Sequence, residues 1–227
     1  MKTKRLIALL AVALGVSALA VMPSANAAPA VFTSNVAINT FTAQSYNLLA
    51  VGGLINIPPT EAANCGPGQA LDISAPTISV PNLATVNAVS STCLVPSPED
   101  QNVNTQATAS AAKVSLLNGA IVLTGVRSQC FTNPAGIVTA ESTVATVNGA
   151  KVSLGALKIT IPGLATIALN QNSQTPAHPT PGELTTVRSV GVLIQVLPYT
   201  THILGKAVTV PAQTISVDTC SITGWAN

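Results

Sequence analysis

Turn-forming sequences occur about every 10 to 20 residues in this chain, and their spacing constrains the fold more than any other feature. The clearest unit is "VSLLNGAIVL" (114–123), in which an Asn-Gly pair separates two apolar segments. Asn-Gly supplies the positive φ values that a tight hairpin turn requires. Similar units are "TISVPNLATV" (77–86), "ITIPGLATIAL" (159–169) and "KAVTVPAQTISV" (206–217). The chain is therefore expected to fold as repeated strand–turn–strand units.

The segments between the turns are rich in Val, Ile and Thr and alternate with a period of two, as "STVATVNGAKVSLGALKITI" (142–161) shows. This period is typical of β-strands. The Ala-rich "QATASAAKVS" (106–115) is also expected to be extended, and 95–104 and 170–183 are expected to be loops. The irregular spacing disfavours a solenoid. These patterns predict an all-β fold, an antiparallel β-sandwich or flattened barrel built from hairpins, with two disulfides.

The first 27 residues have the organisation of a secretory signal peptide. Lys2, Lys4 and Arg5 precede the apolar run 6–21, and Ala25 and Ala27 form an A-x-A cleavage site. The alternative is a membrane anchor that is retained. No second run of 18 apolar residues follows, so a membrane-spanning helix is not expected in the mature chain. We expect residues 28–227 to form a single secreted β-rich domain.

All four cysteines lie in the mature region, and an even number of cysteines in a secreted chain indicates disulfides. Three connectivities are possible. We expect one bond between neighbouring cysteines and one that ties the C-terminal segment to the middle of the chain. A zinc site is the alternative, but there is no C-x-x-C and no close His pair. The expected pairs are Cys65–Cys93 and Cys130–Cys220.

The charge of the mature chain gives no reason to expect a nucleic-acid partner. Without residues 1–27 the chain has six basic and seven acidic residues, and the basic ones are scattered. Only 7% of the residues are charged, whereas 48% are hydrophobic. A chain with that apolar content is expected to fold, and its polarity comes from Ser, Thr, Asn and Gln.

No motif of the chain predicts a catalytic site. His178 lies in a Pro-rich segment, where a solvent-exposed loop residue is expected. His202 is a conceivable general base, but no sequence motif indicates a nucleophile or an orienting carboxylate for it. G-x-S-x-G and nucleotide-binding glycine motifs are absent, and aromatic residues, which line many sugar sites, are only 3% of the chain. Arg127 and Arg188 are expected at strand ends facing solvent. Seven mature carboxylates are available for acid–base chemistry: Glu61, Asp72, Glu99, Asp100, Glu141, Glu183 and Asp218.

One short segment has part of the pattern of a calcium loop. Asp100, Asn102 and Asn104 place oxygen atoms at alternate positions. Thr105 stands where the loop needs Gly, and there is no Glu at the twelfth position. We therefore expect no metal, no cofactor and no catalytic residues, and a protein that is not an enzyme.

Three segments resemble the choice-of-anchor P family, which consists of secreted proteins found mainly in actinobacteria. They are "AAKVSLLNGAIVLTGVRSQC" (111–130), "VNGAKVSLGALKITIPGLATIALNQ" (147–171) and "VDTC" (217–220), and the resemblance extends over most of 65–222. It implies a cysteine-bearing β-rich domain located in the envelope or outside the cell, and it carries over no catalytic residues. The family pattern includes surface anchors, but this sequence ends at "SITGWAN", and "LPYTT" (197–201) lacks the Gly of a sortase signal.

Together these features predict a secreted, disulfide-stabilised structural or adhesive protein of the cell envelope or extracellular space. It is expected to be released or loosely associated with the cell wall. Its expected partners are other envelope proteins or further copies of itself, paired through exposed strand edges. One alternative is a secreted hydrolase, in which carboxylates or His202 come together only in the folded protein. The other is a small-ligand binder with a closed cavity lined by Leu, Val and Ile.

Overall fold

The computed structural model describes residues 30–52, 56–80, 84–100, 103–116, 118–152, 157–162, 165–203 and 206–227. These residues form sixteen strands. They contain no helix, and hence none that could cross a bilayer. The expected signal peptide, 1–27, lies outside them. The strands are β1 (Ala30–Gly52), β2 (Ile57–Thr60), β3 (Ala63–Cys65), β4 (Gln69–Val80), β5 (Ala84–Val95), β6 (Gln106–Leu116), β7 (Ile121–Thr132), β8 (Ile137–Thr143), β9 (Thr146–Val147), β10 (Ala150–Lys151), β11 (Leu157–Ile161), β12 (Ala165–Thr175), β13 (Leu184–Val196), β14 (Tyr199–Ile203), β15 (Lys206–Val210) and β16 (Gln213–Ala226).

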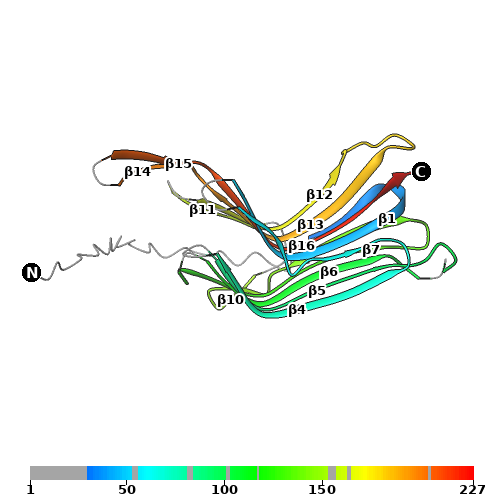
Figure 1. Cartoon of the computed structure of the whole chain (residues 1–227), viewed down its shortest axis with the longest axis horizontal. Helices are drawn as coiled ribbons and strands as arrows, with labels where there is room; N and C mark the ends of the chain where they lie inside the picture. Colours follow the sequence, from blue (N-terminus) through cyan, green and yellow to red (C-terminus); the bar gives the residue numbers. More distant parts are fainter. Residues whose placement is uncertain are drawn as a thin grey trace, which may run out of the picture.

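One antiparallel sheet folds over itself to make two layers (Figure 1). Its strand order is β11-β12-β13-β16-β1-β8-β7-β6-β5-β4. Strand β1 belongs to both layers, because Ala30–Ala37 pairs with β8 and Ile38–Gly52 pairs with β16. We call β11, β12, β13 and β16 the upper layer, and β4 to β8 the lower layer. The sheet is open, since its order ends at β11 and β4, and the all-β, antiparallel, sandwich-like prediction is confirmed.

Three of the four expected hairpins are present, namely β4–β5, β6–β7 and β11–β12. The extended reading of 106–115 is confirmed by β6. The prediction of a fourth hairpin over 206–217 is wrong. Strand β15 pairs with β14, whereas β16 pairs with β1 and β13. Most residues of β16 are buried, so this long segment fits the centre of the layer and not a hairpin with exposed edges. The loop expected from 170 begins only after Thr175, since β12 extends to that residue.

Strands β14 and β15 form a separate two-stranded sheet, which we call the arm. The arm projects away from the two layers at the end opposite to the C-terminus (Figure 1). Pro198 and Pro211 flank it, and proline cannot donate a backbone hydrogen bond to a neighbouring strand. The arm therefore leaves the upper layer at the two points where pairing with the layer ends.

A row of interrupted pairings crosses both layers, and we call it the crease. In the upper layer, pairing omits one residue on each strand: Asn170, Gly191, Asp218 and Asn47. In the lower layer it omits Pro76, Ala88, Ala112 and Gly125. On every second strand the omitted residue has a positive φ. The values are 51° at Ala88, 58° at Gly125, 56° at Asn170 and 49° at Asp218. A left-handed residue disrupts the pleat, and both layers bend in Figure 1.

The crease also changes which residues face the interior. On β5, Ala84 and Val86 are buried before the crease, and Val89, Ser91 and Cys93 are buried after it. The period of two thus continues but shifts by one residue. Because the same shift occurs on β6 and β7, each strand buries side chains along its whole length although it bends in the middle.

Two hydrophobic clusters fill the space between the layers, one on each side of the crease. The first contains Leu48, Val86, Leu123, Ile167 and Val217. The second contains the four cysteines, with smaller residues such as Ala43 and Ala140 around them. Large aliphatic side chains therefore supply the packing on one side, whereas disulfides supplement smaller side chains on the other.

Both disulfides have the expected connectivity, and each joins one layer to the other. Cys65 on β3, which pairs with β1 beside β16, is bonded to Cys93 on β5. Cys130 on β7 is bonded to Cys220 on β16. The two bonds close segments with sequence separations of 28 and 90 residues.

We expect the loss of the Cys130–Cys220 bond to destabilise the fold more than the loss of Cys65–Cys93. In the chain-entropy model, the longer segment contributes about 4.6 kcal/mol and the shorter about 3.6 kcal/mol. The paired variants C130S/C220S and C65S/C93S should therefore differ by about 1 kcal/mol in the free energy of unfolding, measured by guanidinium denaturation. The reverse order would contradict the model.

Gly191 on β13 is expected to tolerate no side chain. A Cβ there would lie 2.7 Å from Val126 Cγ1 and 3.4 Å from Ser128 Oγ, both on the facing layer. We expect Gly191→Ala to lower the free energy of unfolding by about 1–3 kcal/mol through overpacking. Gly66→Ala is the matched control, because its nearest contact is a side-chain atom at 3.6 Å. Equal stability of the two variants would show that the layers can separate to accept a methyl group.

Candidate functional site

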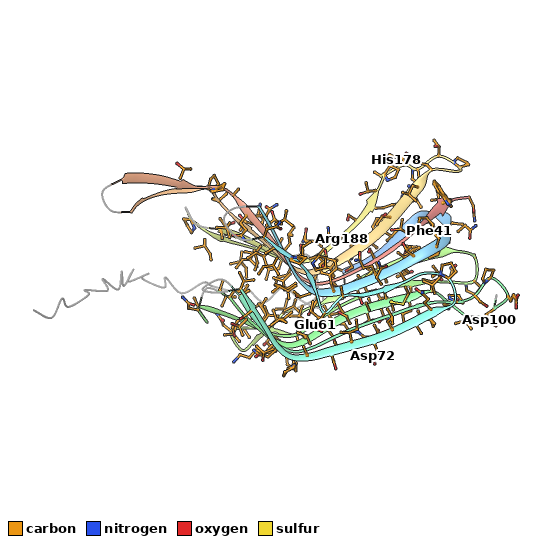
Figure 2. All side chains as sticks on the ribbon, in the orientation of Figure 1. Phe41, Glu61, Asp72, Asp100, His178 and Arg188 are labelled. Atoms are coloured by element: carbon orange, nitrogen blue, oxygen red, sulfur yellow. A yellow bond between two sulfur atoms is a disulfide. The ribbon has the colours of Figure 1, made fainter. Side chains whose placement is uncertain are left out.

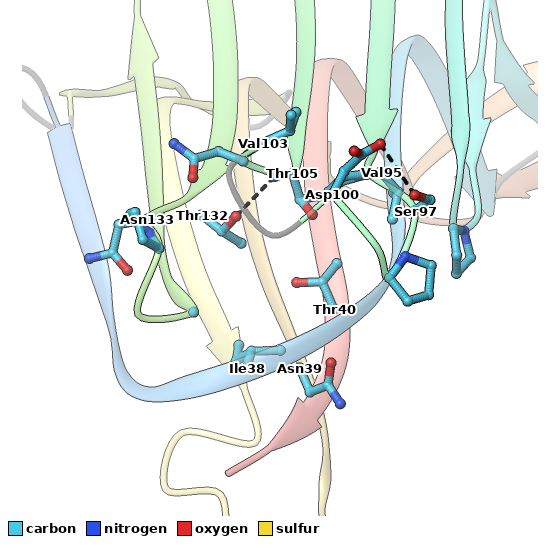
Figure 3. Close-up of a pocket in the computed structure, with 16 residues that line it drawn as sticks. Ile38, Asn39, Thr40, Val95, Ser97, Asp100, Val103, Thr105, Thr132 and Asn133 are labelled. Atoms are coloured by element: carbon cyan, nitrogen blue, oxygen red, sulfur yellow. Dashed lines mark hydrogen bonds between the residues drawn. The ribbon is translucent and has the colours of Figure 1, made fainter.

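A polar pocket of about 260 Å³ lies at the end of the sandwich where β1 passes beneath the loop that joins β5 to β6 (Figure 3). Residues Ile38, Asn39 and Thr40 of β1 form one wall. The other walls come from Pro67, from residues 95–98, 100 and 103–105 between β5 and β6, and from the turn 132–136 between β7 and β8. Pro, Asn, Ser and Thr predominate in this lining, so the pocket differs from the closed aliphatic cavity expected of a small-ligand binder.

Hydrogen bonds within the walls hold the pocket in shape. The Thr105 amide donates to Thr132 Oγ1 at 3.0 Å, and the Thr132 amide donates to the Thr105 carbonyl at 2.9 Å. Nearer the start of the same connection, Ser97 Oγ donates to Asp100 Oδ2 at 3.2 Å. Figure 3 shows both side-chain bonds. The buried Thr40 Oγ1 has no hydrogen-bond partner in the described chain.

Asp100 is the one titratable residue among those that line the pocket. A paired acid–base mechanism needs a second titratable group, and the other polar side chains of the lining are Ser, Thr and Asn. The pocket can therefore donate and accept hydrogen bonds, but its residues form no pair for hydrolysis.

Asp100, the first residue of the candidate calcium loop, takes part in two turns. The Asp100 amide donates to the Ser97 carbonyl at 3.0 Å, and the Val103 amide donates to the Asp100 carbonyl at 3.2 Å. Asn104 lines the pocket, whereas Asn102 lies outside the described residues. Over the part of the chain that the structure describes, no three His, Cys, Asp or Glu side chains come together as metal ligands would.

The structure does not bring the other candidate residues together in the pocket. His178 is exposed in the connection between β12 and β13 (Figure 2). The side chain of His202, on the arm, lies outside the described residues. Arg127 is exposed on β7 and donates to Gln129 Oε1 at 2.9 Å. Arg188 is half-buried on β13, within a strand and not at the strand end that its sequence suggested.

Asp218 is the one buried carboxylate among the seven that the sequence offers. It lies between the layers at the crease, where Asn47 Nδ2 donates to its Oδ1 at 2.7 Å. Its Oδ2 has no partner in the described chain. Burial raises the pKa of this carboxyl well above the usual range, and the hydrogen bond from Asn47 opposes the rise.

Asn47 connects Asp218 to the lower layer. Its Nδ2 also donates to the Ser110 carbonyl at 3.0 Å and to the Ser90 carbonyl at 3.3 Å, and its Oδ1 accepts from Ser91 Oγ at 2.8 Å. Ser128 Oγ donates to the Asp218 carbonyl at 2.6 Å. This polar cluster lies at the crease, and its side chains donate to the backbone carbonyls of Ser90, Ser110 and Asp218. We assign it a structural role, because it has no contact with the pocket lining.

We expect Asp218 to make stability depend on pH. The folded chain favours the neutral carboxyl, whereas the unfolded chain ionises near its ordinary pKa of about 4. The cost of burial is therefore absent at low pH. As the pH rises above about 4, the free energy of unfolding should fall by up to about 1.4 kcal/mol per pH unit, until the pH reaches the folded-state pKa.

Asp218→Asn removes this titration and keeps an oxygen that can accept from Asn47. We expect the variant to have a higher free energy of unfolding at neutral pH and a smaller pH slope, measured by denaturation between about pH 4 and pH 8. Asp72→Asn, at an exposed position of β4, is the control and should keep the slope. Parallel curves for Asp218→Asn and the parent chain would refute the assignment.

No protein-family model, curated protein or solved structure matches this chain.

Proposed function

We propose that this chain is a secreted structural or adhesive protein of the cell envelope or extracellular space, which acts by association and not by catalysis. The observation that carries the proposal is an open, disulfide-linked sheet with a long edge strand that can pair with another chain. The resemblance to choice-of-anchor P proteins supports the same location. Signal-peptide cleavage after residue 27 is part of the proposal.

The cysteine pairing supports an oxidising compartment. Both disulfides are buried, and the described residues include no free cysteine. Such bonds form in secreted proteins and are rare in the reducing cytosol. The low charge of the chain suits a protein that relies on hydroxyl and amide groups for its surface.

The edge strand β4 offers a surface for association. It is twelve residues long and, in the described chain, forms a ladder with β5 alone. Most of its residues are exposed, including Leu71, and Asp72 is its one charged residue. Natural edge strands are commonly protected by lysines, by proline or by short length, and of these β4 has only one proline. Pro76 interrupts it only at the crease.

The arm is a second element that suits association. An isolated two-stranded hairpin is marginally stable in water and usually needs further strands or a packed face. Apolar residues of the arm fall mainly in every second cross-strand pair. One set of pairs is Tyr199–Val210 and Thr201–Val208, and the alternate set is Thr200–Thr209 and His202–Ala207. A partner that covers the arm would supply the further strands or packed face that such a hairpin usually needs.

Substitution of the edge tests the proposal. Ser74 and Ser79 are exposed on β4, and lysine at both positions should block pairing because it brings charge and side-chain bulk to the edge. We expect the mature chain to self-associate in sedimentation-velocity experiments, and S74K/S79K to shift it toward monomer. Ser115→Lys, on the interior strand β6, is the matched control.

Location is tested separately, by mass spectrometry of cytosolic, cell-wall and culture-supernatant fractions with non-reducing peptide mapping. We expect the oxidised, processed chain in the last two fractions. A chain confined to the cytosol would refute the proposed location. An inert monomer at every concentration, with no retention on cell walls, would refute the adhesive role.

A further inference from the structure

Arg188 lies on the outer face of the upper layer, on the concave side of its bend (Figure 2). The side chain is half-buried and reaches across the crease. Its Nη2 donates to Tyr46 Oη at 2.7 Å and to Ser216 Oγ at 3.4 Å. Tyr46 lies on the same side of the crease as Arg188, and Ser216 lies on the other side. The guanidinium group is therefore held at one place on the surface of the bend.

The positive charge of Arg188 has no protein counter-ion. No carboxylate in the described residues forms an ion pair with it, and both of its hydrogen bonds come from Nη2 and go to neutral hydroxyl groups. Its Nη1 and Nε groups donate to no protein atom of the described chain. Guanidinium groups have five N–H donors in a planar arrangement that suits carboxylate and phosphate oxygens.

Hydroxyl groups lie on both sides of Arg188. The pairing places Ser173 on β12 and Ser221 on β16 directly beside it, on the same face of the layer. Ser173 is exposed and Ser221 is half-buried. Neither hydroxyl bonds to another protein group in the described chain, so both can donate to a ligand that approaches the guanidinium.

We propose that Arg188, with Ser173 and Ser221, forms a binding site for an oxyanion, that is, a carboxylate or phosphate group. The fixed cation supplies charge-assisted hydrogen bonds through Nη1 and Nε, and the serines supply neutral ones. Partial burial lowers the effective dielectric constant around the guanidinium and strengthens its attraction for the anion. Arg127 also has hydroxyl residues beside it, Ser110 and Thr143, but it is exposed and its guanidinium bonds to Gln129 Oε1, not to two hydroxyl groups.

The site does not depend on the proposed envelope role, since it would bind an oxyanion wherever the protein is located. A purely structural alternative is that Arg188 only braces the bend through Tyr46 and Ser216. The two possibilities differ in one measurable property, because a brace has no saturable affinity for anions.

The test is an NMR titration of the oxidised mature chain with sodium phosphate and with sodium acetate, at constant ionic strength set with sodium chloride. We expect saturable shifts of the amides around Arg188 and Ser221 with at least one of the two anions. The anion that saturates identifies the preferred group. Shifts that stay linear for both anions would show that Arg188 is a brace.

Variants make the assignment specific. Arg188→Gln should weaken binding about tenfold or more, because it removes the charge-assisted bonds. Arg127→Gln is the matched control and should bind as the parent does. If Arg188→Gln does not fold, S173A/S221A keeps the guanidinium and should weaken binding about threefold or more through the loss of neutral donors. Unchanged affinity in S173A/S221A, or equal losses in the two arginine variants, would overturn the site.

Discussion

The crease is the constraint on which the rest of the structure depends. At this level the strands of both layers interrupt their pairing, and the interruption turns the strands without ending them. The space inside a bent pair of layers is packed along its whole length only if the alternation of inward-facing residues shifts at the bend. The phase shift of one residue achieves this, and it leaves backbone groups between the layers that need partners. In the buried cluster at the crease, Asn47 Nδ2 and Ser128 Oγ donate to backbone carbonyls, and Ser91 Oγ donates to Asn47 Oδ1.

Much of the architecture could be predicted from residue patterns. Asn-Gly and Pro-containing turns located three hairpins, because those residues adopt turn conformations at low cost. The secreted context and the even number of cysteines predicted disulfides, and the pairing that we chose among three connectivities is the observed one. The pairing of β16 was not predictable from its neighbours in sequence, since a central strand pairs with distant segments, and nothing local distinguishes 213–226 from a hairpin strand. The sequence did not predict the crease, because apolar and polar residues alternate on both sides of it and a shift of one residue is hard to detect in that pattern. Gly125, Asn170 and Asp218 are nevertheless residue types that accept positive φ. Ala88 gave no such signal.

The sites were harder to foresee than the fold. The polar pocket combines three segments far apart in sequence, and its residues are types that also occur in ordinary turns. Asp218 belongs to a cysteine motif, "VDTC", and only its burial beside Asn47 distinguishes it from the other carboxylates. Arg188 was expected at a strand end, and its position across the bend depends on Tyr46, which is 142 residues away. Long-range proximity of this kind leaves no periodic trace in a single sequence.

The two disulfides have a mechanical consequence. They close segments with separations of 28 and 90 residues, and the segments do not overlap, since one runs from Cys65 to Cys93 and the other from Cys130 to Cys220. Tension applied between the two ends of the chain passes through the sulfur atoms and bypasses both loops. A tethered molecule pulled in this way can lengthen only through its remaining residues, so every strand from β8 to β15 is shielded from the force until a bridge is chemically cut.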